Sequence, residues 1–224
     1  MPRPVLLCFF LLLACGRPLA PEERIFAGQL YGDSLDPSRV RLHDGALIGK
    51  TTHTRPRRPR LTCRERILPE PATETVTVSP AAFVLYNHVF FARKWYSADF
   101  LAGYPEDMNL VRAMLFAHEM THVWQWQNRR KTGYAPFRSA GEHVRSRNPY
   151  LFEVDAEARF LDYGYEQQAS LVEEYVCCAT LDASAPRTRR LRDMLSGAVP
   201  LQQLTIPDSP ILPGTKAETP GICR

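Results

Sequence analysis

The most constraining feature of this sequence is the pentad His118-Glu119-Met120-Thr121-His122, an HExxH motif. On an α-helix, residues four positions apart project from the same face, so the two imidazoles can bind one metal ion. Glu119 would then lie beside the metal, where its carboxylate can accept a proton from a water molecule. The motif therefore requires a helix here, and it predicts a Zn2+ site with His118 and His122 as ligands and Glu119 as the catalytic base.

The residues around the motif favour a long helix over residues 105–131. Glu106 and Asp107 are expected in its first turn, and a basic Arg-Arg-Lys run precedes Gly133, in keeping with the helix dipole. Apolar residues fall on several faces, so we expect this helix to be buried. The alternative is a purely structural histidine pair, but two buried imidazoles without a ligand would be hard to satisfy.

A third metal ligand is needed, because a catalytic zinc takes three protein ligands and a water. The extended pattern HExxHxxGxxH fails, since Gln125 and Asn128 occupy its glycine and third-histidine positions. A glutamate from a later helix is the remaining common solution. Glu166 is preferred because it begins a strongly helical segment with an apolar face. Glu153, on an expected strand, and Glu157 are the alternatives.

The N-terminus has the pattern of a signal peptide over residues 1–15. One arginine is followed by an apolar run over residues 5–14, which is too short to span a bilayer. The next residues, Leu-Leu-Ala-Cys-Gly, resemble a bacterial lipobox with Cys15 as the acylated residue. We therefore expect an exported protein of the bacterial periplasm or outer membrane, held to the membrane by an N-terminal lipid anchor. The alternative is an ordinary signal peptide cleaved after Gly16.

The rest of the chain is long enough for one domain. Without the leader and its single arginine, 27 Lys and Arg residues stand against 24 Asp and Glu, a formal charge of +3 that does not argue for a nucleic-acid partner. We expect the zinc-binding domain over residues 16–182, with an arginine- and proline-rich loop inserted at 53–72. That loop either attracts an anionic surface or is a solvated insertion. Residues 183–224 are expected to form a short helix and a Pro-rich tail.

Four cysteines beyond the leader predict two disulfides, because an exported protein meets an oxidising compartment. Cys177 and Cys178 are adjacent, and a bond between them would be strained. Each is therefore expected to pair with one of Cys63 and Cys223, and the spacing leaves both pairings open. No CxxC spacing suggests a metal site at these cysteines.

Short segments of alternating or continuous apolar residues predict a small sheet at residues 40–43, 74–79 and 88–92. Residues 88–93 precede the motif helix, and we expect them to form the sheet edge that pairs with an extended substrate. A covered core strand is the alternative. The predicted fold is α+β and zincin-like, with a small, twisted, mainly antiparallel sheet, an HExxH active-site helix and a second ligand-bearing helix.

Several segments carry a family resemblance: RPL at 17–19, YGDSLDPSRVRLH at 31–43, HEMTHVWQ at 118–125 and YGYEQQA at 163–169. Together they resemble the bacterial zinc metallopeptidases that are Vgr-related or associated with Rhs proteins. They are also similar to the peptidase-like domain of proteins linked to contractile injection systems. The resemblance covers roughly residues 17–180, and it implies a gluzincin-type α+β domain with Glu166 in the family motif. The arginine-rich insert, the cysteines and the leader depart from the family pattern.

The predicted function is therefore a zinc-dependent peptidase of the cell envelope with a peptide or protein substrate. His143, Tyr163 and Tyr165 are candidates for the donor that stabilises the oxyanion. Two alternatives are a non-catalytic, zinc-stabilised adaptor of a secretion or envelope assembly, and a secreted effector. Glu119 favours catalysis, because an adaptor has no need of a general base.

Overall fold

The computed structural model describes residues 16–145, 148–153, 157–213 and 221–224, so the expected leader and Cys15 lie outside the described residues. The fold is α+β, as predicted. Its helices are α2 (Pro21–Tyr31), α3 (Cys63–Ile67), α4 (Leu110–Gln127), α5 (Arg129–Thr132), α6 (Pro136–Arg145), α7 (Tyr165–Leu181) and α8 (Pro186–Ser196). Its strands are β1 (Arg41–His43), β2 (His53–Pro56), β3 (Thr75–Val78), β4 (Ala82–Leu85) and β5 (His88–Phe91).

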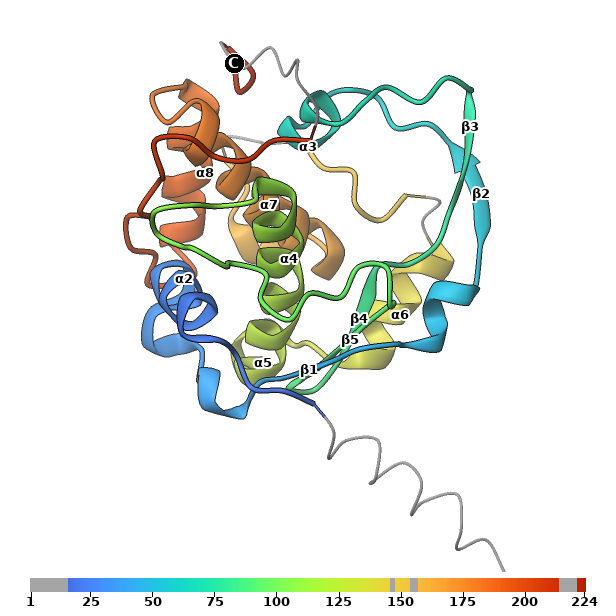
Figure 1. Cartoon of the computed structure of the whole chain (residues 1–224), viewed down its shortest axis with the longest axis horizontal. Helices are drawn as coiled ribbons and strands as arrows, with labels where there is room; N and C mark the ends of the chain where they lie inside the picture. The colour runs from blue at the N-terminus through green and yellow to red at the C-terminus, as the bar shows by residue number, and fades with distance from the viewer. Residues whose placement is uncertain (1–15, 146–147, 154–156, 214–220) are drawn as a thin grey trace, which may run out of the picture.

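Helix α4 lies at the centre of the molecule (Figure 1), where it packs along α7 and also contacts α2, β4 and β5. Its apolar residues point in several directions, and Phe116, Met120 and Trp124 are almost fully buried. Phe26 of α2 and Phe91 of β5 are buried in the same core. Removing each such side chain from water contributes about 1.5–3 kcal/mol, so the burial of α4 is well supported energetically.

The start of α4 differs from the sequence prediction. The helix begins at Leu110 instead of residue 105, because the side chain of Asn109 caps it by accepting a hydrogen bond from the Arg112 amide at 3.1 Å. Glu106 and Asp107 therefore precede the helix. At the other end, α5 stops at Gly133, whose φ of 69° is a left-handed conformation that glycine adopts without strain.

The three-stranded sheet has the order β1-β5-β4. Strand β4 pairs antiparallel with β5, whereas β1 pairs parallel with it, with Arg41 opposite His88. The prediction that residues 88–93 form a sheet edge is therefore wrong, because both sides of β5 carry a partner strand. Parallel pairing joins segments that are distant in sequence, so no local sequence pattern predicts it.

The arginine-rich insert is more ordered than predicted. It contains β2, which pairs antiparallel with β3 in a separate two-stranded sheet, and the short helix α3, capped by the Thr62 hydroxyl. The disulfides join Cys63 to Cys177 and Cys178 to Cys223, which agrees with the expected pattern and selects one of its two pairings. The first disulfide anchors the insert to α7.

The C-terminal segment forms helix α8 and then continues without regular structure through residue 213. It runs past α2, where the Gln202 amide donates to the Gln29 carbonyl at 2.8 Å, and reaches the start of α4, where the Leu110 amide donates to the Ile211 carbonyl at 3.0 Å. Among the helices in the described ranges, none has both the length and the apolar character needed to cross a bilayer.

Candidate metal centre

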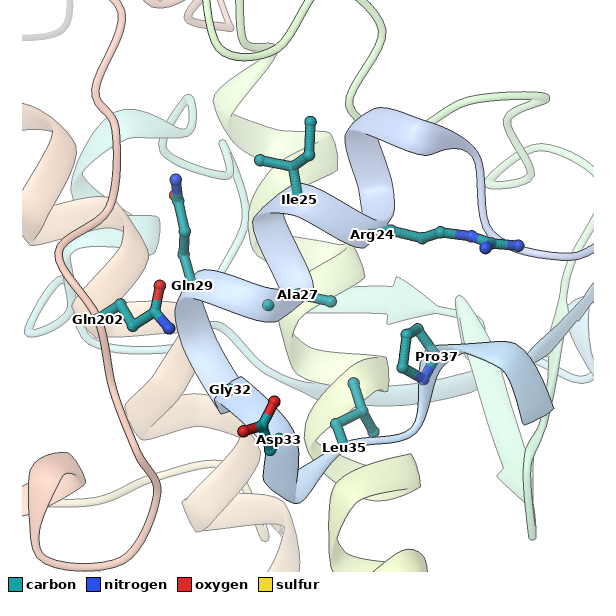
Figure 2. Close-up of a pocket in the computed structure, with 10 residues that line it drawn as sticks. Arg24, Ile25, Ala27, Gln29, Gly32, Asp33, Leu35, Pro37 and Gln202 are labelled. Atoms are coloured by element: carbon teal, nitrogen blue, oxygen red, sulfur yellow. The ribbon is translucent and has the colours of Figure 1, made fainter.

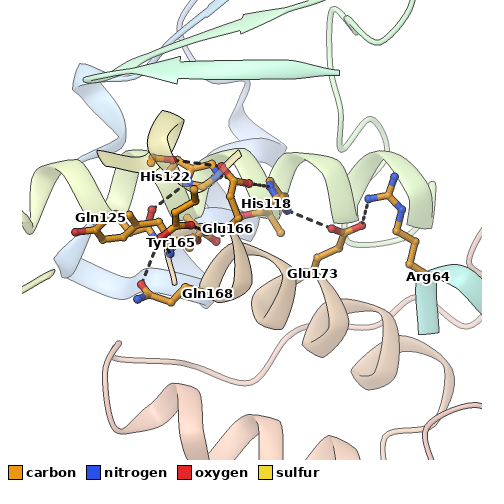
Figure 3. Close-up of polar contacts among 12 residues, drawn as sticks. Arg64, His118, His122, Gln125, Tyr165, Glu166, Gln168 and Glu173 are labelled. Carbon is orange, nitrogen blue, oxygen red and sulfur yellow. Dashed lines mark hydrogen bonds and ion pairs between the residues drawn. The ribbon is translucent and has the colours of Figure 1, made fainter. Parts of the chain in front are cut away.

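Two imidazoles and one carboxylate converge between α4 and α7 (Figure 3). The Nε2 atoms of His118 and His122 each lie 3.5 Å from Oε2 of Glu166, which stands in the first turn of α7. All three residues are buried. Zinc ligands at about 2.0–2.2 Å in a tetrahedral arrangement lie roughly 3.3–3.5 Å apart, so this set of donor atoms has the spacing that a metal ion requires.

The other imidazole nitrogens have partners of their own. Nδ1 of His118 lies 3.2 Å from a carboxylate oxygen of Glu173, and Nδ1 of His122 lies 2.9 Å from the amide oxygen of Gln125. With Nδ1–H donating to each oxygen, both Nε2 lone pairs are directed at the position beside Glu166. These contacts thus hold both imidazoles with Nε2 facing Glu166.

The order of these contacts shows how the helices are arranged. His118 contacts Glu173, whereas Gln125, further along α4, donates to the Gln168 side chain at 2.9 Å and to the Tyr165 carbonyl at 3.1 Å, both near the start of α7. Later positions in α4 therefore meet earlier positions in α7. This antiparallel packing is what brings Glu166 to the histidines.

Burial and charge act in opposite directions on the ionisable groups of this cluster. Burial lowers the pKa of His118, but hydrogen bonds to Glu166 and Glu173 outweigh it and raise the pKa. The pKa of His122 is also raised, because the charge of Glu166 and its hydrogen bond outweigh the burial. Burial raises the pKa of Glu119 despite the opposing effect of both histidines. The carboxylates thus attract positive charge into a buried position, as a cation site requires.

The alternative ligand candidates lie elsewhere on the surface. Glu153 and Glu157 are both exposed, while Glu166 is 5% exposed. The strand expected around Glu153 is absent from residues 150–153, and residues 154–156 fall outside the described part of the chain. Of the three candidate glutamates, the structure brings Glu166 to the two histidines.

The predicted oxyanion donors are placed differently. The hydroxyl of Tyr163 donates to the Glu153 carbonyl at 2.8 Å, and that of Tyr165 donates to the Gly133 carbonyl at 2.8 Å. Both hydroxyl protons are therefore directed at main-chain acceptors. His143 belongs to α6, but its side chain lies outside the described part of the structure.

Two tyrosines that the sequence analysis did not select flank the cluster. The Tyr134 ring lies 6.2 Å from the His122 ring, and the Tyr150 ring lies 5.9 Å from the His118 ring, between centroids. Burial raises the pKa of both phenols, and Glu166 and Glu119 raise it further. Both residues stand in connecting segments without periodicity, so no sequence signal could have identified them.

A second group of potential ligands, Cys63, Cys178 and Cys223, also has its sulfur atoms close together. Each of these sulfurs is already bonded in a disulfide. A metal-binding cysteine acts as a thiolate, so this group supplies no ligand while the disulfides are intact.

The cavity drawn in Figure 2 is lined mainly by α2 and the residues that follow it. It has a volume of about 410 Å³, and its lining includes Arg24, Gln29, Asp33 and Gln202. None of the residues that line it belongs to the cluster on α4 and α7. This cavity is therefore not the site of the predicted chemistry.

Fold and site together define an α+β domain with a potential metal-binding group of two histidines and one glutamate. No protein-family model matches the chain. The chain is similar to the type VI secretion system spike protein VgrG2b of Pseudomonas aeruginosa, with 26% identity over 162 residues. This match covers 71% of the chain but spans 13% of the length of that spike protein.

The fold is also similar to that of the effector domain of Pseudomonas aeruginosa VgrG2b, with a TM-score of 0.51 and 24% sequence identity. The structural match covers 83% of this chain and 84% of that domain. The expected similarity to a Vgr protein is thereby confirmed, and it lies with the effector domain.

Proposed function

We propose that this chain is a zinc-dependent peptidase in which His118, His122 and Glu166 hold one Zn2+ and Glu119 is the catalytic base. The observation that carries the proposal is the convergence of two Nε2 atoms on one carboxylate oxygen at 3.5 Å each. Two imidazoles and a carboxylate are a common ligand set of catalytic zinc, and three protein ligands leave a position open for water. A purely structural zinc site has four protein ligands.

When bound, Zn2+ supplies Lewis acidity, which lowers the pKa of a water molecule toward neutrality and polarises a peptide carbonyl. Glu119 is 5% exposed and follows His118 in sequence. Its carboxylate is therefore shielded from bulk solvent and can accept a proton from the attacking water. The same carboxyl group can then pass that proton to the leaving amine. We propose Tyr134 and Tyr150, whose rings flank the two histidines, as candidates to donate a hydrogen bond to the developing oxyanion.

Replacing Glu119 by Gln tests the catalytic role. We expect the variant to keep one zinc per chain, because Glu119 is not a ligand, and to cleave a diverse peptide library at least about 100-fold more slowly than the wild type. Metal analysis and cleavage rates at several pH values provide the two readouts. A wild-type protein that holds one zinc and cleaves no peptide would instead support the adaptor.

For the biological setting we propose an exported effector, since the matching structure is an effector domain and the sequence match is to a secretion-system spike protein. This departs from the expected resident enzyme of the periplasm or outer membrane. A lipid anchor on Cys15, with the membrane as partner, remains a proposal. It suits a resident envelope protein better than an exported effector. The substrate is proposed to be a peptide or protein, without a nucleic-acid partner.

A further inference from the structure

The arginine-rich insert reaches the metal centre through α3. The Cys63 amide donates to the buried carboxylate of Glu174 at 2.7 Å, and the Cys63 side chain forms a disulfide with Cys177. Both partners belong to α7. A covalent bond and a buried charge-assisted hydrogen bond thus fix the first residue of α3 on the helix that carries Glu166.

Arg64, the next residue, connects this anchor to a metal ligand. Its Nη1 atom lies 2.9 Å from one carboxylate oxygen of Glu173, while the other oxygen lies 3.2 Å from Nδ1 of His118. Figure 3 shows Arg64, Glu173 and His118 in one row. Glu173 is 5% exposed, so its two oxygens are divided between the guanidinium and the imidazole. The position of Arg64 therefore determines how Glu173 faces His118.

The two ligand histidines differ in this respect. Gln125, the partner of His122, lies on α4 itself, three residues further along, and its amide is held by Gln168 and the Tyr165 carbonyl. The partner of His118 belongs to α7 and is held in turn by the insert. Groups that orient a ligand histidine typically change metal affinity by 10–100-fold when they are lost. A change of that size in metal affinity can therefore be controlled by the contacts that hold Arg64 in place.

We propose that Arg64 is a positioning residue of the metal centre, acting on His118 through Glu173, and that the Cys63–Cys177 disulfide makes zinc affinity depend on the oxidation of this cysteine pair. The inference rests on the proposed zinc site. In the oxidation, the two thiols lose two electrons and two protons as the S–S bond forms, and a disulfide of an oxidant protein or small molecule is reduced to two thiols. The reduced chain leaves α3 without its covalent anchor and binds zinc more weakly.

The adjacent cysteines of α7 provide a matched control. The double variant Cys63→Ala/Cys177→Ala removes the disulfide that anchors α3, whereas Cys178→Ala/Cys223→Ala removes one that anchors the C-terminus to the same helix. Arg64→Gln tests the guanidinium with both disulfides intact, and Arg64→Lys is the conservative rescue. Arg57→Gln is its control, since Arg57 belongs to the same insert but pairs with the exposed Glu70 and Glu74.

The zinc dissociation constant of each full-length variant is measured by competition with a chromophoric chelator at one pH, with circular dichroism to verify folding. We expect about 10–100-fold weaker binding for Arg64→Gln and for Cys63→Ala/Cys177→Ala, partial recovery in Arg64→Lys, and less than about twofold change in both controls. Equal affinity in all variants, or equal weakening in both disulfide variants, overturns the inference and leaves the zinc site intact. A wild type that binds no zinc overturns the proposed function itself.

Discussion

At the scale of single residues, His118 and His122 each have one nitrogen directed at Glu166 and the other in contact with a second polar side chain. The spacing of His118 and His122 predicted that their imidazoles share a helix face, and it does so because helix geometry is local. Their partners Gln125 and Glu173 differ in how far the sequence can predict them. Gln125 lies on α4 itself, three residues beyond His122, whereas the residue that meets Nδ1 of His118 depends on how α4 and α7 pack.

Glu166→Ala should remove the third ligand. We expect zinc affinity to fall at least about 100-fold, because the two histidines alone leave two protein ligands, neither of which carries a negative charge. The dissociation constant from chelator competition is the measurement. Glu153→Ala is the matched control, since that residue is exposed and belongs to a candidate ligand set that the structure does not assemble. Unchanged affinity in Glu166→Ala, or a loss in Glu153→Ala, would contradict this assignment.

At the scale of elements, local sequence signals predicted which segments are helices and strands. Tertiary pairing decided which strand is central and how the insert is ordered. Helix α7 and strand β5 lie where the apolar pattern placed them. The role of β5 as a central strand depends on β1, which lies more than forty residues earlier in the chain and pairs with it in parallel. The insert was expected to be a loop because of its prolines and like charges. Strand β3 and the bond to Cys177 give it order that its own residues do not specify.

The pairing of β1 with β5 also has a consequence for stability. It brings Nε2 of His43 to 2.9 Å from Nδ1 of His88, and burial, followed by the charge of His88, lowers the pKa of His43 to about 4. The unfolded chain binds a proton on His43 near pH 6.5, but the folded chain binds it only near pH 4. The stability present above pH 6.5 is therefore lost progressively as the pH falls through this interval.

His43→Gln should reduce that loss. We expect the decrease in Tm of the metal-free protein between pH 7 and pH 4.5 to be smaller in this variant by about 2–4 °C, measured by thermal denaturation. His53→Gln is the control, because His53 is exposed on β2. The same pH dependence in wild type and His43→Gln would show that this pair does not contribute.

At the scale of the whole molecule, composition and length predicted one domain, and the segments that resemble Vgr-related proteins predicted the similarity to VgrG2b. The location of the domain in a cell could not be read from the fold. The signal that would decide it lies in residues 1–15, outside the described structure. The leader pattern predicts a lipid-anchored protein of the cell envelope, whereas the effector proposal predicts an exported protein.

Fractionation of cells that express the full chain separates these settings. The effector proposal predicts recovery of the chain in the culture medium or in target cells, without an acyl group on Cys15. Mass spectrometry of the N-terminal peptide provides the second readout, with Cys15→Ser as the matched variant. An acylated form in the outer membrane, lost in Cys15→Ser, would favour the resident envelope enzyme instead.

In the proposed metal centre, one zinc binds to two imidazoles and a carboxylate between α4 and α7. Zinc-edge X-ray absorption of the full chain loaded with one equivalent of Zn2+ tests it most directly. We expect nitrogen and oxygen ligands at about 2.0–2.2 Å, with the outer-shell scattering of two imidazoles. Sulfur at about 2.3 Å would place the metal at the cysteines instead, and a spectrum without imidazole scattering would contradict the assignment of His118 and His122.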